Sequence, residues 1–159
     1  MNAFKRSRRA LFALLPAPLL LAAAAARADN KEKPHRLALH VDDRDEAKMN
    51  LALNNAVNVS DFYTAKAAEI EIEIVAYGPG LHMLREDTAP AHIKERIKSF
   101  AQSMPNVAFA ACDNTRIGMA KAEGKKPEEI PLISKAKIVP AGVVRLMELQ
   151  EQGWSYVKP

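Results

Sequence analysis

The residue with the clearest chemical potential is a lone cysteine in the stretch AFAACDN, residues 108–114. Cys112 is the only cysteine in the 159-residue chain. An apolar run precedes it, and Asp113, Asn114 and Thr115 follow it as residues that cap helices, so the pattern predicts a strand that ends where a helix begins. A thiol there feels the positive end of the helix dipole, which favours the nucleophilic thiolate. The spacing equally allows a small, buried, unreactive side chain.

The other residues that could act with this thiol follow from a rule for open parallel sheets. Ligands collect beyond the carboxyl ends of the strands, because the connecting loops and helix N-termini converge there. That rule selects Asp42 and Asp43, residues 77–82, residues 112–115 and residues 140–142. Cys112 is the candidate catalytic residue, and the candidate binding residues are Asn114, Thr115, Gly78, Gly80 and His82.

The four histidines differ in what their surroundings predict. His82 follows the GPG turn, and its loop should lie at the same sheet edge as the cysteine. His40 stands inside an apolar strand, which is more typical of a packed core residue than of a ligand. His35 and His92 are predicted at the surface. With one cysteine and scattered histidines, we expect no metal site and no cofactor.

The sequence lacks the signature motifs of several enzyme classes. The chain has no C-x-x-C, H-E-x-x-H or G-x-S-x-G motif and no phosphate-binding glycine loop, which argues against thioredoxin-like, zincin, hydrolase and P-loop chemistry. The acidic pair Asp42–Asp43 is most simply a solvated turn at the start of a helix.

Residues 1–28 have the pattern of a secretory signal peptide. Four cations precede an apolar run, and Ala26-Arg27-Ala28 fits a cleavage site before Asp29. The apolar run contains two prolines and is shorter than the ~20 residues of a membrane span, so we expect no stable membrane anchor. The arginine pair in SRRALF leaves twin-arginine export open beside the general secretory route. The predicted location is the periplasm.

The leader also explains the net charge of +4. Without residues 1–28 the chain keeps 18 Lys plus Arg against 19 Asp plus Glu, a net charge of −1. A protein with that balance has no excess of cations to attract phosphates, so we expect no nucleic-acid partner.

The mature chain, residues 29–159, alternates strand and helix patterns and is expected to form one domain. Strands are predicted at 36–41, 69–78, 106–112 and 136–142, with a last short one within 154–159. Helices are predicted from Asp43 or Asp45 onward and at 91–104, 114–124 and 142–153. This alternation favours βαβ crossovers and a mostly parallel sheet with helices on both faces.

Four stretches resemble the DsrE/DsrF-like family, in its exported, signal-peptide-bearing branch: LALHVDD, VAYGPGLHML, FAACDNT and KIVPAGVVRLMELQEQGWSYVKP. The resemblance covers nearly all of residues 35–159. It implies a three-layer α/β/α sandwich around a five-stranded sheet, often assembled into homo-oligomers such as trimers or hexamers. In sulfur-relay members a cysteine at the end of the third strand carries sulfur as a persulfide, and that role maps onto Cys112.

The sequence departs from this pattern in two ways. Relay members work in the cytoplasm, whereas this chain is predicted to be exported. Asp113 stands where this branch often has glycine, and an acid beside the thiol opposes thiolate formation. Even with these departures, the resemblance implies a sulfur carrier or sulfurtransferase-like protein with donor and acceptor proteins as partners. The alternative is a non-catalytic, oligomeric binding or assembly protein, and the exposure of Cys112 distinguishes the two.

Overall fold

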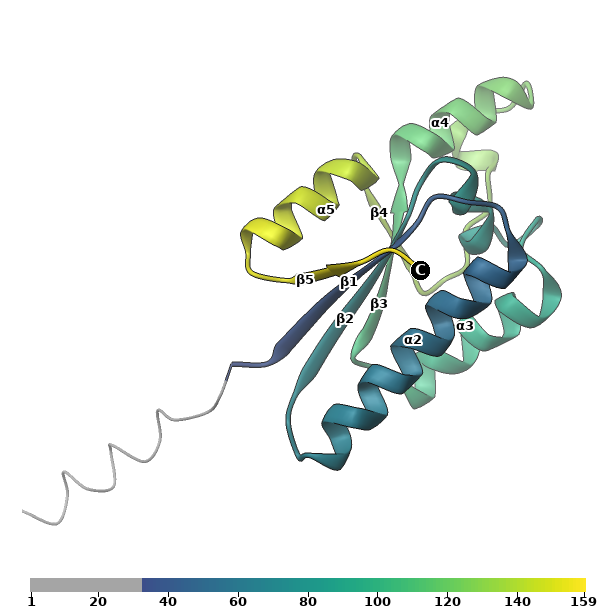
Figure 1. Ribbon diagram of the computed structural model, residues 1–159. Coiled ribbons are helices and arrows are strands. Elements are labelled where there is room, and N and C mark those ends of the chain that lie inside the picture. Colours follow the sequence, from purple (N-terminus) through teal and green to yellow (C-terminus); the bar gives the residue numbers. More distant parts are fainter. Residues whose placement is uncertain (1–32) are drawn as a thin grey trace, which may run out of the picture. The chain divides into compact units, whose positions relative to one another are not determined.

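The structure is a computed structural model that describes residues 33–159, which form one compact unit. The predicted leader and its cleavage site lie outside the described residues. All strand pairs are parallel, and the sheet order is β4-β3-β2-β1-β5 (Figure 1). The strands are β1 (His35–Val41), β2 (Ile70–Ala76), β3 (Val107–Cys112), β4 (Ala136–Val139) and β5 (Ser155–Val157).

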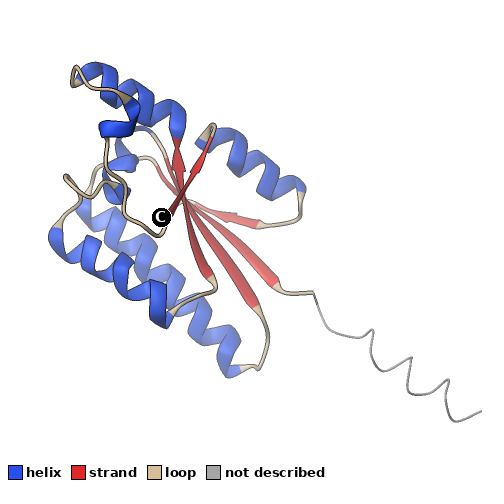
Figure 2. Ribbon diagram, turned by 180° about the vertical axis from the view of Figure 1, so that it is seen from behind, coloured by secondary structure: helices blue, strands red, loops and turns tan. Residues whose placement is uncertain are grey.

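Helices connect these strands in the predicted alternation. They are α2 (Glu46–Ala65), α3 (Ala91–Ser103), α4 (Asp113–Ala122) and α5 (Gly142–Glu151), with short 3₁₀ helices η1 (Gly78–Leu84) and η2 (Pro127–Glu129). In Figures 1 and 2, α2 and α3 lie on one side of the sheet and α5 on the other. The three-layer α/β/α sandwich around a parallel five-stranded sheet is thereby confirmed.

The sheet has two unequal apolar layers. The larger one packs α2, α3 and η1 against side chains such as Leu39, Ile74 and Phe109. The smaller one packs α5, through Leu146 and Leu149, against the opposite face. Because side chains alternate along a strand, each central strand supplies both layers, which explains its nearly continuous apolar sequence.

The acidic alternation in β2 has a structural reason. Glu71 is exposed, but Glu73 points toward α5 and is buried. Both of its carboxylate oxygens accept hydrogen bonds from the Arg145 guanidinium of α5, at 2.7 Å each. A paired geometry of this kind stabilises a buried charge and orients α5 on the sheet.

The loop after β2 is held tightly against the end of β1. A Cβ atom on Gly80 would lie 2.2 Å from the carbonyl oxygen of Val41, so only glycine allows this approach. Gly78 has a φ of +53°, which also favours glycine. The GPG sequence thus fixes how η1 leaves the sheet edge.

None of the helices within residues 33–159 has the length and apolar character needed to cross a membrane.

Candidate functional site

Cys112 occupies the junction that its sequence predicts. It is the last residue of β3 and the N-cap of α4, and its Sγ accepts a hydrogen bond from the Thr115 N–H at 3.4 Å. Strand alternation places it on the face of Ala110, toward α5. The residue is only 4% exposed. The sulfur therefore has a charge-stabilising donor but little direct access to solvent.

Two backbone N–H groups join the neighbouring loops to the start of α4. The Asn114 N–H donates to the Pro140 carbonyl at 3.2 Å. The Gly78 N–H donates to Thr115 Oγ1 at 2.9 Å. The structure therefore brings Gly78, Asn114 and Thr115 together around Cys112, and all three act through their backbone N–H groups, Thr115 also through its hydroxyl.

Asp113 is less unfavourable to a negative sulfur than its sequence position suggests. Its Oδ1 accepts a hydrogen bond from Arg116 Nε at 2.9 Å, and the arginine is three residues further along α4. An opposite charge at this distance offsets the repulsion that the aspartate exerts on a neighbouring thiolate. The charge of Asp113 is thus compensated within the first turn of the helix.

Tyr77 is the aromatic neighbour of the thiol. The β2–β3 register ends with Ala76 opposite Ala111, so the next step places Tyr77 beside Cys112. Tyr77 packs in the apolar layer under α5, where a Cβ atom on Gly142 would lie 2.8 Å from its ring. Burial raises the pKa of Tyr77, and the nearby charge of Asp42 adds to this effect.

His40 lies on the other side of Tyr77 and has no role in the sequence-based hypothesis. It is buried, as its apolar strand predicts, and its ring stacks on Tyr77 with centroids 4.7 Å apart. His40 Nδ1 is hydrogen bonded to Tyr156 Oη at 2.7 Å. Its Nε2 is 3.5 Å from Asp42 Oδ2 and has no hydrogen-bond partner within residues 33–159.

Asp42 completes this cluster at the end of β1. Its carboxylate accepts a hydrogen bond from Lys158 Nζ at 2.7 Å, which lowers the pKa of Asp42. Burial lowers the pKa of His40, and the positive charge of Lys158 adds to this effect while Asp42 opposes it. The imidazole is therefore neutral near neutral pH.

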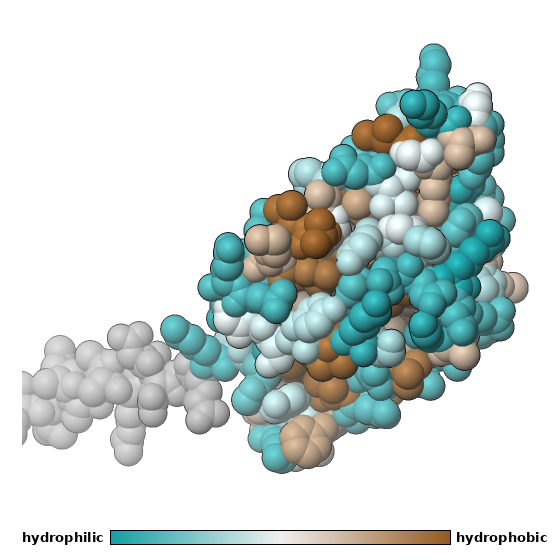
Figure 3. Space-filling model, turned by 45° about the horizontal axis from the view of Figure 1, so that its top comes forward, coloured by the Kyte–Doolittle hydropathy of each residue, from teal (hydrophilic) through white to brown (hydrophobic). Residues whose placement is uncertain are grey.

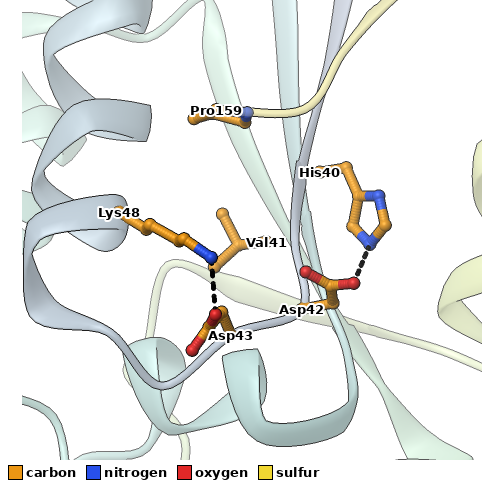
Figure 4. Close-up of a pocket in the computed structure, with 6 residues that line it drawn as sticks. All are labelled: His40, Val41, Asp42, Asp43, Lys48 and Pro159. Carbon is orange, nitrogen blue, oxygen red and sulfur yellow. Dashed lines mark hydrogen bonds and ion pairs between the residues drawn. The ribbon is translucent and has the colours of Figure 1, made fainter.

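A small cavity lies beside the cluster, where the carboxyl end of β1 meets the chain terminus (Figure 4). Its volume is about 10 Å³, which is close to the room that one water molecule needs. The figure shows its lining residues, with the Lys48–Asp43 ion pair on one side of β1 and the His40–Asp42 pair on the other: His40, Val41, Asp42, Asp43, Lys48 and Pro159.

The structure gives His82 other partners. Its Nδ1 is hydrogen bonded to Thr88 Oγ1 at 2.7 Å, and its pKa is lowered first by burial and then by Arg44 and Arg85. Within residues 33–159 no hydrogen bond joins His82 to Cys112, so the role of His82 as a binding residue stays a prediction. Gly80 packs the loop on Val41. The histidine near the sulfur is instead His40, through Tyr77.

No group of three or more potential metal ligands occurs within the described part of the chain.

Comparison with known proteins agrees with this architecture, and the matched region includes every residue of the site. The sequence model of the DsrE/DsrF-like family matches residues 35–159. The chain belongs to the DsrE/DsrF-like family. A solved structure, that of the protein of unknown function MTH1491 from Methanobacterium thermoautotrophicum, is similar to this DsrE/DsrF-like chain, with 28% sequence identity and a TM-score of 0.62. The match covers 79% of this chain and 99% of the other. No curated protein matches the chain.

Proposed function

We propose that this DsrE/DsrF-like protein carries sulfur as a persulfide on Cys112. The observation that supports this most is the placement of Sγ at the first turn of α4, where the Thr115 N–H points at it. A donor at that position stabilises negative charge on sulfur, and the nucleophilic form of a cysteine is the thiolate. The family is associated with sulfur relay, which fits this chemistry.

The proposed step needs no external oxidant. The Cys112 thiolate attacks the outer sulfur of a persulfide or polysulfide donor, and a new S–S bond forms at Sγ. The donor's S–S bond breaks, and its inner sulfur leaves as a thiolate with the electron pair. Transfer to an acceptor thiolate is the same exchange, with Cys112 as the leaving thiolate.

The burial of Cys112 favours a second candidate. At 4% exposure the side chain has the environment of a small hydrophobic residue. In that case the protein is a non-catalytic binding or assembly protein with the family fold. The experiment that separates the two candidates is sulfur loading of the purified chain with inorganic polysulfide, with Cys112→Ser as the comparison.

We also propose that the chain assembles into a homo-oligomer, a trimer or hexamer, through the outer side of α5. Family members are often oligomeric. The outward side chains Val143, Val144 and Met147 are 47–54% exposed, so this helix is apolar on both sides. Figure 3 shows a hydrophobic patch on the side of the molecule where Figure 1 places α5. Sulfur donor and acceptor proteins would then use the remaining surface.

The variant Met147→Glu is expected to lower the mass of the assembly, because it places a charge in this apolar contact. Light scattering at micromolar concentration measures the mass directly. Leu51→Glu on α2 is the matched control, since Leu51 is also an exposed apolar side chain. A wild-type mass equal to one chain would contradict the proposal.

We propose that the leader directs export to the periplasm and that the mature chain begins at Asp29. N-terminal sequencing of the protein isolated from its native source is expected to read DNKEK. Recovery of the uncleaved chain from the membrane fraction would show that the leader is retained as an anchor.

A further inference from the structure

Any chemistry at Cys112 requires part of the protein to move, because the side chain is almost fully buried. The elements around the sulfur differ in how firmly they are held. Segments that open most readily are those with few buried apolar contacts and exposed backbone. A weakly attached element whose contacts lead toward the sulfur is therefore the one expected to give access.

Two of the neighbouring elements are firmly anchored. The loop η1 is fixed by the close approach of Gly80 to Val41 and by buried Leu81 and Leu84. Helix α5 is held by Leu146 and Leu149 in the apolar layer and by the Arg145–Glu73 pair. Moving either one would break a packed layer, which costs several kcal/mol.

The C-terminal strap, defined here as residues 156–159, is attached by far fewer contacts. Strand β5 pairs with β1 over only three positions, and Tyr156 and Val157 are 41% and 42% exposed. The turn at Gly153, whose φ is +85°, lies three residues before the strap. Its specific side-chain contacts are Tyr156 with His40 and Lys158 with Asp42.

These two contacts connect the strap to the thiol through Tyr77. The Tyr77 ring stacks on His40, and Tyr77 and Cys112 are the residues that follow the last β2–β3 pair, Ala76 and Ala111. The charges of Asp42 and Lys158 both influence the pKa of Tyr77, in opposite directions. Release of the strap would remove the support on one side of His40 and leave the His40–Tyr77 stack free to shift.

We propose that the C-terminal strap is a latch that closes the Cys112 site, with His40 and Asp42 as its two attachment points. The biological use of the latch rests on the proposed function, but its geometry does not. The latch would control access to Cys112 whatever reaction the thiol performs. In the closed form Tyr77 shields the sulfur. In the open form the strap leaves β1 and the sulfur becomes reachable by a donor or acceptor.

Acid is expected to open the latch. The groups facing His40 are Asp42 after β1, Tyr77 after β2, and Tyr156 and Lys158 from the strap. Burial keeps the pKa of His40 below its ordinary value of about 6.5 while the latch is closed. Opening returns the ring to solvent and restores that value, so the open form binds the proton better. Lowering the pH through about 6.5 therefore favours opening.

The direct test is the rate at which iodoacetamide alkylates Cys112 in the full mature chain at a fixed pH. Tyr156→Phe keeps the ring but removes the hydroxyl that bonds His40, and Lys158→Met removes the ion pair with Asp42. We expect Tyr156→Phe to raise the rate roughly three- to tenfold, as the loss of one hydrogen bond predicts. Lys158→Met should raise it less, because that ion pair is partly exposed.

The chain offers a matched control at the opposite end of β1. Tyr63 stacks on His35 with centroids 4.0 Å apart, in the same kind of tyrosine–histidine contact. Tyr63→Phe is expected to leave the alkylation rate unchanged. Wild-type rates in both Tyr156→Phe and Lys158→Met would overturn the latch. Hydrogen exchange of the wild-type chain is a second readout. The amides of residues 156–158 should exchange together and faster than those of β3, and equal protection would also overturn the latch.

The single tryptophan reports the pH response. Trp154 directly precedes β5, and its emission should move to longer wavelength when the pH falls from about 7.5 to about 5.5. In His40→Gln this shift should disappear. A wild-type emission that stays constant across the same range would contradict the acid response.

Failure of the latch is distinguishable from failure of the proposed function. If wild type accepts no sulfur but Tyr156→Phe speeds alkylation, the latch stands and the sulfur-carrier proposal fails. If Cys112 accepts sulfur and no strap variant alters its alkylation, the carrier proposal stands and the latch fails.

Discussion

Inorganic polysulfide is expected to add one labile sulfur to each wild-type chain and none to Cys112→Ser. The chain has no other thiol, so the variant removes the proposed acceptor completely. A serine hydroxyl is similar in size to the thiol and can accept the Thr115 N–H in its place. The variant should therefore keep its fold, and the whole effect should fall on sulfur uptake.

Intact mass before and after treatment with a small thiol measures this uptake and its reversibility. A circular dichroism spectrum and a urea midpoint close to those of wild type establish that Cys112→Ser is folded. Equal sulfur uptake by both proteins would mean that the sulfur is bound elsewhere, and the carrier role of Cys112 would be wrong.

Arg85→Ala is expected to lower the free energy of unfolding by about 3 kcal/mol. Arg85 is 1% exposed, and its guanidinium donates to both carboxylate oxygens of Asp87 and to the carboxylate of Glu123. These contacts join η1 to the C-terminal end of α4, so they help to fix both segments that border the thiol. The expected loss lies at the low end for a buried pair, because Asp87 and Glu123 are each about one-third exposed.

Urea unfolding at neutral pH measures this change as a lower midpoint with an unchanged m-value. Lys98→Ala is the surface control. Its pair with Glu86 is exposed on both sides, so its removal should leave the urea midpoint close to that of wild type. Equal midpoints for Arg85→Ala and Lys98→Ala would contradict the structural role of Arg85.

The same cluster predicts a direction for acid unfolding. Arg85 lowers the pKa of Glu123 to about 2, and it also lowers the pKa of Asp87. Because the folded pKa values are depressed, the cluster contributes its full stability above the unfolded carboxylate pKa of about 4.3. That contribution is lost as the pH falls toward about 2. Arg85→Ala should therefore show a weaker pH dependence than wild type over this range.

The regular elements of the fold were predictable from local patterns. The side chains of β3, VAFAAC, contribute in alternation to both apolar layers. The strand therefore has a continuous apolar sequence, which ends at residues that cap a helix. Helix α2 begins where Asp45 accepts hydrogen bonds from the Ala47 and Lys48 N–H groups. An acidic residue directly before apolar residues at helical spacing predicts such a helix start.

The candidate site was predictable only in part, because its members come from distant segments. Cys112, Asn114, Thr115 and Gly78 lie at strand ends, and the sheet-edge rule locates such residues. Tyr156 meets His40 across 116 positions of sequence. That contact depends on β5 pairing with β1, and nothing in the local pattern of either strand specifies the sheet order.

The burial of Cys112 was also outside the reach of the sequence. A strand end followed by a helix cap fits an exposed thiol and a shielded one equally well. In the structure Cys112 is 4% exposed, and Tyr77 packs against Gly142 in the apolar layer under α5. With the thiol buried in this way, the proposed sulfur transfer requires an opening motion.

The most direct test of the central proposal is the intact mass of the protein isolated from its native source without reductant. If Cys112 carries sulfur in the cell, part of the population should be heavier by one sulfur atom. A small thiol should remove that mass, and peptide mapping should locate it at Cys112. A population with only the unmodified mass, before and after the thiol, would contradict the sulfur-carrier function.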